Sequence, residues 1–134
     1  MTKIKYQIEA KAQTVCWRVV CGSTKGYTGQ RERSLSSVID IIEGLHYKII
    51  DEEKKTPLPC IISEGYLIGR TGKSAYREKV YFCDFSLSPR AEPIRVQEFG
   101  KRVRWYAFKL GEALNQTRMY IELNGKTEVW KVDN

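Results

Sequence analysis

A glycine-rich stretch at residues 69–74, Gly-Arg-Thr-Gly-Lys-Ser, is the first candidate for chemistry. Glycine amides followed by Lys and Ser can cradle a polyphosphate and its magnesium ion. The spacing does not fit, because a phosphate loop needs glycine where Leu67 stands, and Gly69 lies only three residues before Gly72. The residues after Ser74 have the pattern of a strand, whereas a phosphate loop leads into a helix N-terminus. We therefore predict a basic hairpin loop here.

Acid–base or nucleophilic catalysis would have to use His46, the single histidine. It falls beside Ile39 and Ile42 on the apolar side of a predicted helix, which favours a core or boundary position over a general base. No spacing indicates a Ser–His or Cys–His pair. The carboxylates of this region are better explained as a solvated acidic face than as a metal site. They are Asp40, Glu43, Asp51, Glu52 and Glu53. We predict no catalytic residue.

The four cysteines, Cys16, Cys21, Cys60 and Cys83, lie inside apolar stretches. A four-cysteine zinc site would need two close pairs, but here the intervals hold four, 38 and 22 residues. We interpret them as small core residues of a protein from a reducing compartment, and we predict neither a metal nor a cofactor.

The net charge of +7 is concentrated in one part of the chain. Residues 65–109 hold ten Lys or Arg against four Asp or Glu, and they carry nine of the fifteen aromatic residues. Cations can neutralise phosphates while neighbouring rings stack on unpaired bases. The candidate nucleic-acid-binding residues are Arg70, Lys73, Arg77, Lys79, Lys101, Arg102, Arg104, Trp105 and Tyr106. The alternative is that these rings form the core and the cations only solubilise the protein.

This distribution favours a small basic binding protein that holds RNA or single-stranded DNA. A second hypothesis is a protein-interaction module, either an adaptor or a small inhibitor, that docks an acidic partner surface without catalytic activity. Edge strands could also pair two copies into a homodimer. An enzyme stays open, because a site assembled from distant residues leaves no linear motif. No set of residues matches the motifs of a known family.

The elements that must position these residues follow from hydrophobic periodicity. Residues 3–10 alternate between apolar and polar, and residues 14–21 are apolar on both faces, so we predict an antiparallel hairpin whose second strand is central. Residues 35–50 form the clearest amphipathic helix, with Ser34 as N-cap. Further strands are expected at 60–68, 79–87 and 94–99. Residues 101–114 fit either period, and we predict a strand entering a short helix at about 104–115.

The C-terminal residues predict a hairpin, 117–123 and 126–132, around Asn124-Gly125. Either a two-residue turn or a three-residue loop that includes Lys126 would serve, and each gives a different register. The order of elements predicts a single α+β domain over residues 1–134, with a mainly antiparallel sheet and the long helix packed on it. The longest apolar runs have four residues, so we expect no membrane span, no signal peptide and a cytoplasmic location.

Overall fold

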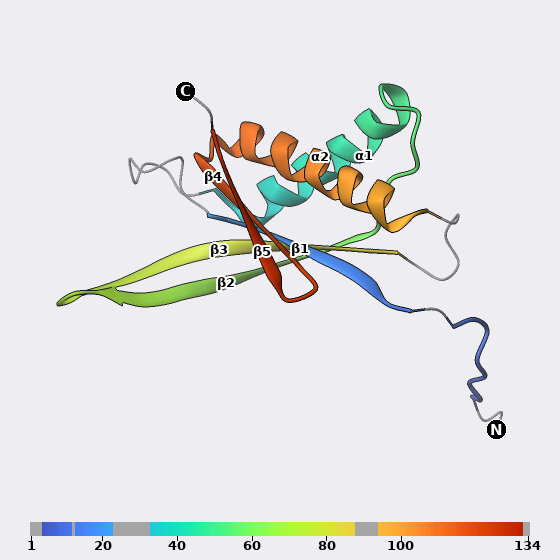
Figure 1. Ribbon diagram of the computed structural model, residues 1–134, viewed down its shortest axis with the longest axis horizontal. Helices are drawn as coiled ribbons and strands as arrows, with labels where there is room; N and C mark the ends of the chain where they lie inside the picture. Colours follow the sequence, from blue (N-terminus) through green and yellow to red (C-terminus); the bar gives the residue numbers. More distant parts are fainter. Residues whose placement is uncertain (1–3, 12, 23–32, 88–93, 133–134) are drawn as a thin grey trace.

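Two helices cover one face of a five-stranded antiparallel sheet (Figure 1). The computed structural model describes residues 4–11, 13–22, 33–87 and 94–132. The strand order is β2-β3-β1-β4-β5. The elements are β1 (Val15–Gly22), α1 (Leu35–Asp51), β2 (Cys60–Thr71), β3 (Ser74–Leu87), α2 (Val96–Leu114), β4 (Arg118–Leu123) and β5 (Lys126–Lys131). The chain is a single small α+β domain, and the predicted fold class is confirmed.

The predicted amphipathic helix is confirmed as α1, with Ser34 as its N-cap. The Ser34 hydroxyl accepts a hydrogen bond of 3.2 Å from the backbone N–H of Ser37, which satisfies one of the free donors of the first turn. Its buried side chains recur every three or four residues and are those of Val38, Ile42, Leu45 and Ile49. This spacing puts them on one face, and that face packs against the sheet and α2.

The prediction for residues 94–114 is wrong in two respects. The structure has no strand at 94–99, because α2 begins at Val96, and residues 101–114 are helical throughout. The helical period prevails because a helix places the apolar residues that recur every three or four positions on one face, and that face packs into the core. These buried residues are Phe99, Val103, Tyr106, Ala107, Leu110 and Leu114. The expected short second helix is therefore the longer of the two, with 19 residues.

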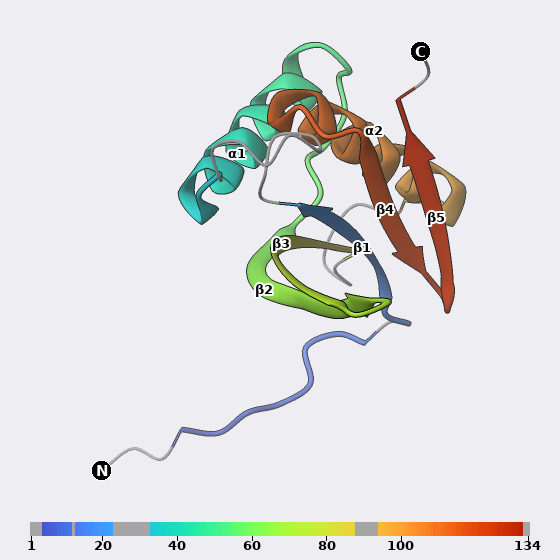
Figure 2. The same cartoon turned by 90° about the vertical axis from the view of Figure 1, so that its left-hand side faces the viewer.

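The predicted central position of β1 is confirmed, since it pairs with β3 on one side and β4 on the other. The predicted hairpin between residues 3–10 and β1 is wrong, because both edges of β1 are already occupied and residues 4–11 form no strand. These residues lead away from the sheet and are exposed to solvent (Figure 2).

The two tight turns of the sheet use left-handed backbone. Leu123 pairs with Lys126, so the C-terminal hairpin has the two-residue turn, with φ of 44° at Asn124 and 78° at Gly125. This is the turn that Asn-Gly favours. The predicted basic hairpin loop is confirmed as the turn between β2 and β3.

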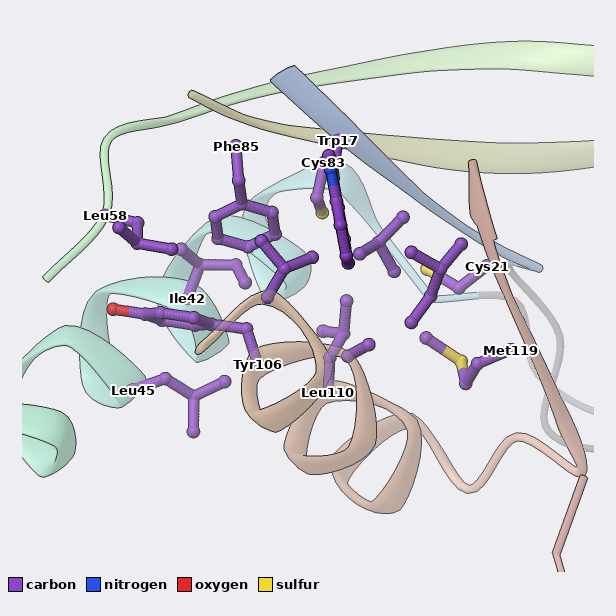
Figure 3. Close-up of a cluster of buried hydrophobic side chains, with 14 of the residues drawn as sticks. Trp17, Cys21, Ile42, Leu45, Leu58, Cys83, Phe85, Tyr106, Leu110 and Met119 are labelled. Atoms are coloured by element: carbon purple, nitrogen blue, oxygen red, sulfur yellow. The ribbon is translucent and has the colours of Figure 1, made fainter. Parts of the chain in front are cut away.

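The core lies between the helices and the helix-facing side of the sheet (Figure 3). Trp17 and Phe85 point from the sheet toward Tyr106 and Leu110 of α2. A Cβ atom at Gly100 would lie 2.5 Å from Cη2 of Trp17, so a glycine is needed where α2 crosses this ring.

The cysteines are only partly the core residues that we predicted. Cys21 and Cys83 are buried and Cys60 is half-buried, but Cys16 is exposed because it lies on the sheet face opposite the helices. Within the described ranges, neither helix is long and apolar enough to cross a membrane.

Candidate functional site

The candidate site is a cavity of about 540 Å³ between the C-terminal half of α2 and the β4–β5 hairpin. Its lining combines apolar residues with a polar rim. The apolar residues are Phe108, Gly111, Met119, Trp130 and Val132, and the polar ones are Glu112, Asn115, Gln116, Thr117 and Lys131. A volume of this size can hold a nucleoside-sized molecule.

The end of α2 shapes the floor of the cavity. Asn115 adopts left-handed backbone, with φ of 55°, and the N–H of Gln116 donates to the carbonyl of Gly111 at 2.9 Å. This turn reverses the chain directly into β4. Met119 of β4 then packs on Gly111, where a Cβ atom would lie 2.9 Å from Cγ of Met119. The glycine thus lets β4 approach the helix closely.

Two aromatic rings from different elements form the wall. The centroids of Phe108 and Trp130 are 4.9 Å apart, and the ring planes meet at 64°. Both side chains are partly open to solvent, with 38% and 42% exposed. Exposed rings beside a hollow can contact the face of a flat ligand.

An ion pair between α2 and β5 holds this wall in place. The guanidinium of Arg104 donates to both carboxylate oxygens of Glu128, at 3.0 and 2.7 Å. The indole Nε1 of Trp130 donates to the same carboxylate at 3.0 Å. These hydrogen bonds, chiefly the one from Arg104, hold the pKa of the Glu128 carboxyl below its usual value. They fix the orientation of Trp130 against the helix.

The end of α2 brings negative charge to one side of the cavity. The C-terminal end of a helix carries a partial negative charge, and the last turn of α2 contains no basic residue. Glu112 is exposed there and borders the cavity. Lys131 also borders the cavity, but its side chain points to the strand face opposite Trp130, because successive side chains of a strand alternate. The arrangement suits a ligand with a flat ring and a cationic centre.

The residues that we predicted to bind nucleic acid fall into two separate sets. Arg70, Lys73, Arg77 and Lys79 lie on the β2–β3 hairpin, which projects beyond the sheet and away from α2 (Figures 1 and 2). Lys101, Arg102, Arg104, Trp105 and Tyr106 lie on α2. The two sets do not form one surface.

Most members of the α2 set already have structural roles. Arg102 donates to Glu98 and to the backbone carbonyl of Thr56, both at 3.1 Å. Trp105 is half-buried against Tyr106, with ring centroids 5.2 Å apart. Lys101 stays exposed.

Tyr106 is fully buried in the core, and His46 packs against it from a half-buried position. Its hydroxyl lies 2.7 Å from Nδ1 of His46. Burial raises the pKa of Tyr106 to about 12 and lowers the pKa of His46. His46 is thus a boundary residue, as predicted, and Tyr106 is closed to a ligand.

A second cavity, of about 570 Å³, lies on the sheet face opposite the helices. Arg18 and Asp84 at its centre neutralise each other through hydrogen bonds of 2.7 and 3.1 Å. Cys16 and Glu122 also line it. Because its main charges are already paired, it offers less to a ligand than the α2–β5 cavity. In the ranges that the structure describes, no three His, Cys, Asp or Glu residues are placed to hold a metal.

Sequence reasoning missed the α2–β5 cavity. Glu112 and Trp130 lie in the C-terminal part of the chain, which has no excess of positive charge. The one usable signal was the Asn-Gly turn, which fixes which β5 side chains face α2. The meeting of Phe108 with Trp130 required the packing of the hairpin on the helix.

The fold has counterparts among solved structures. A phage SAM lyase in complex with S-methyl-5'-thioadenosine matches with a TM-score of 0.60 and 12% identity, over 97% of each chain. A phage SAM lyase in the apo state matches with a TM-score of 0.57 and 13% identity, over 99% of this chain and 97% of that one. At this identity the likeness shows a shared fold. No family model and no curated protein sequence matches this chain.

This comparison contradicts the predicted function. The sequence favoured a nucleic-acid-binding protein, or an inhibitor or adaptor without catalytic activity, but both matching structures are those of an enzyme. The predicted cations lie on α2 and on a β2–β3 hairpin that projects away from it, and two of them, Arg102 and Arg104, are bound to carboxylates of the same chain.

Proposed function

We propose that this chain is a lyase that binds S-adenosylmethionine (SAM) in the α2–β5 cavity and releases S-methyl-5'-thioadenosine. The cavity itself carries the proposal: two aromatic rings and the carboxylate of Glu112 at the end of α2 border a volume of about 540 Å³. The shared fold with the phage SAM lyase supports the same choice of ligand.

Two parts of SAM have counterparts in the lining. The adenine ring stacks on Trp130 and Phe108, because an aromatic face accepts a flat heterocycle. The sulfonium is a cation and lies toward the end of α2 and the carboxylate of Glu112. The carboxylate of the amino-acid chain folds back toward Cγ, beside the sulfonium.

The proposed reaction is an intramolecular substitution within SAM. To leave S-methyl-5'-thioadenosine, the bond between the sulfonium sulfur and the Cγ atom of the amino-acid chain must break, and its electron pair becomes a lone pair on the neutral thioether. An oxygen of the substrate's own carboxylate forms the new bond to Cγ and closes a lactone. Opposite charges cancel in this step, so an apolar cavity that holds the substrate folded favours it. No protein nucleophile or base is needed, which agrees with a sequence that lacks a catalytic motif.

The test is to incubate the purified chain with SAM and measure S-methyl-5'-thioadenosine by chromatography and mass spectrometry. We expect product in proportion to enzyme and time, above the uncatalysed decay of SAM. Phe108→Ala removes one wall and should lower kcat/KM about tenfold, the loss of roughly 1.4 kcal/mol that one stacking contact supplies.

Tyr47→Ala is the matched control, because Tyr47 is an exposed aromatic on a helix outside the cavity. It should keep the wild-type rate. No product from wild type, or equal losses in the two variants, would show that this cavity is not a SAM lyase site.

A further inference from the structure

The ring of Trp130 in the cavity wall is bonded to two residues that lie outside the lining of the cavity. Its indole Nε1 donates to Oε1 of Glu128 at 3.0 Å. The guanidinium of Arg104 donates to both oxygens of the same carboxylate, at 3.0 and 2.7 Å. Trp130 borders the cavity, whereas Arg104 and Glu128 are not among the residues that line it. A change at either residue can therefore reach a bound ligand through the ring.

Arg104 is also in contact with the core of the protein. Its guanidinium lies over the ring of Trp17, 5.1 Å from the ring centroid. Trp17 is 5% exposed and packs edge-on against Phe99 of α2, with the ring centroids 5.8 Å apart. A cation over an aromatic face is attracted to it, and more strongly where water is excluded. Arg104 thus joins a buried ring to the carboxylate of Glu128, and the position of that carboxylate is tied to the core.

Trp130 needs such an anchor because packing covers only part of it. The residue lies on the edge strand β5 and is 42% exposed. An exposed side chain can occupy several staggered rotamers. The hydrogen bond to Glu128 and the contact with Phe108 together favour one of them. A ring that is already ordered binds a ligand more tightly than a ring that binding must first order.

We propose that Arg104 is a positioning residue for ligand binding in the α2–β5 cavity, and that it acts through Glu128 on the ring of Trp130. This inference rests on the proposed function, because it concerns the same ligand. Arg104 makes no contact with the ligand in this arrangement. It holds the carboxylate that holds the ring.

The test is a double-mutant cycle in which isothermal titration measures the affinity for S-methyl-5'-thioadenosine. Arg104→Ala should weaken binding about fivefold, because the hydrogen bond to the ring loses its anchor. Trp130→Phe keeps an aromatic ring but removes the donor to Glu128, so it should weaken binding by a similar factor. Adding Arg104→Ala to Trp130→Phe should weaken binding by less than about twofold more, since the link is already broken.

Arg18→Ala is the matched control for a loss of stability alone. Arg18 also makes two hydrogen bonds to one carboxylate, that of Asp84, and it also lies over an aromatic ring, that of Phe82, at 4.6 Å. These residues belong to β1 and β3, away from the α2–β5 cavity. Arg18→Ala should therefore keep the wild-type affinity.

The indole N–H resonance of Trp130 reports the same link in the protein without ligand. In nitrogen–proton correlation spectra it is the indole signal that Trp130→Phe removes. Arg104→Ala should shift or broaden this signal, and Arg18→Ala should leave it unchanged.

Three results would overturn this inference alone: an unchanged Trp130 signal or wild-type affinity in Arg104→Ala, a loss that persists undiminished in the Trp130→Phe background, or an equal loss in Arg18→Ala. Absence of binding by the wild type would instead overturn the proposed function, and this inference with it.

Discussion

The α2–β5 cavity and the distal β2–β3 hairpin both present aromatic rings to solvent, but they hold these rings in different ways. In the cavity, Phe108 and Trp130 come from a helix and a strand that meet at an angle, and an ion pair fixes their separation. In the hairpin, Tyr66 and Tyr76 stand on one two-stranded ribbon, with Arg77 over the ring of Tyr66 at 5.1 Å. A two-stranded ribbon has two open faces. In the α2–β5 cavity a helix packs against a hairpin, and this contact between elements cannot be read from amino-acid composition.

The largest effect should come from removing an aromatic ring of the cavity. Trp130→Ala should weaken the binding of S-methyl-5'-thioadenosine about tenfold or more, because a stacking contact contributes roughly 1–3 kcal/mol. Tyr66→Ala removes a ring of similar exposure from the hairpin and should leave the affinity unchanged. Isothermal titration measures both. A larger loss for Tyr66→Ala would reverse the comparison and move the site to the hairpin.

The arginines of the two regions should differ in what they do for stability. Arg104→Ala breaks a two-point ion pair between α2 and β5, so we expect a loss of about 1 kcal/mol and a fall in Tm of about 4 °C. Arg77→Ala removes only an exposed contact with Tyr66 and should change the free energy of unfolding by less than about 0.5 kcal/mol. Thermal melts of the two variants provide the measurement. Equal losses would mean that Arg104 does not anchor β5.

Because of the same ion pair, the contribution of Glu128 to the stability of the fold should depend on pH. The pKa of Glu128 is held low by the hydrogen bonds from Arg104 and, less strongly, from Trp130. A carboxyl with a lowered pKa in the fold stabilises it above the unfolded pKa of about 4.3, and this is lost as pH falls through the folded pKa. The difference in Tm between wild type and Glu128→Gln should therefore be constant near neutral pH and shrink below about pH 4.

The control is to repeat this comparison in the Arg104→Ala background. There Glu128 has lost its main partner, so Glu128→Gln should have little effect at any pH. A pH-dependent difference that survives in this background would assign the effect to another group.

The smallest expected effect is a difference between the affinities of SAM and S-methyl-5'-thioadenosine for one variant. Glu112→Gln removes an exposed carboxylate at the rim, and exposed charge pairs contribute about 0.2–1 kcal/mol. We expect SAM to bind about two- to fivefold more weakly, while the neutral thioether S-methyl-5'-thioadenosine binds as before. Glu64→Gln on β2 is the matched control and should change neither affinity. Equal weakening for both ligands would show that Glu112 does not act on the sulfonium.

Periodicity and turn chemistry by themselves determined much of this fold. Three features follow from local sequence patterns: the apolar stripe of α1 with its Ser34 cap, the central strand β1 and the Asn-Gly turn. Local patterns predict the folded state well where no tertiary contact competes with them. Residues 4–11 have an equally clear strand pattern, yet both edges of β1 are occupied and these residues form no strand. Residues 101–114 fit two periods, and only contact with the core decided for the helix.

The candidate site depended wholly on tertiary structure. Arg104 and Glu128 are 24 residues apart in the chain, and neither their pairing nor the approach of Trp130 to Phe108 leaves a linear pattern. Residues 65–109 are basic and rich in aromatic residues, but in the structure their hairpin projects away from α2, and α2 buries Phe99 and Tyr106 in the core. Sequence fixes which side chains an element offers, whereas packing decides which of them meet and which stay open to a ligand.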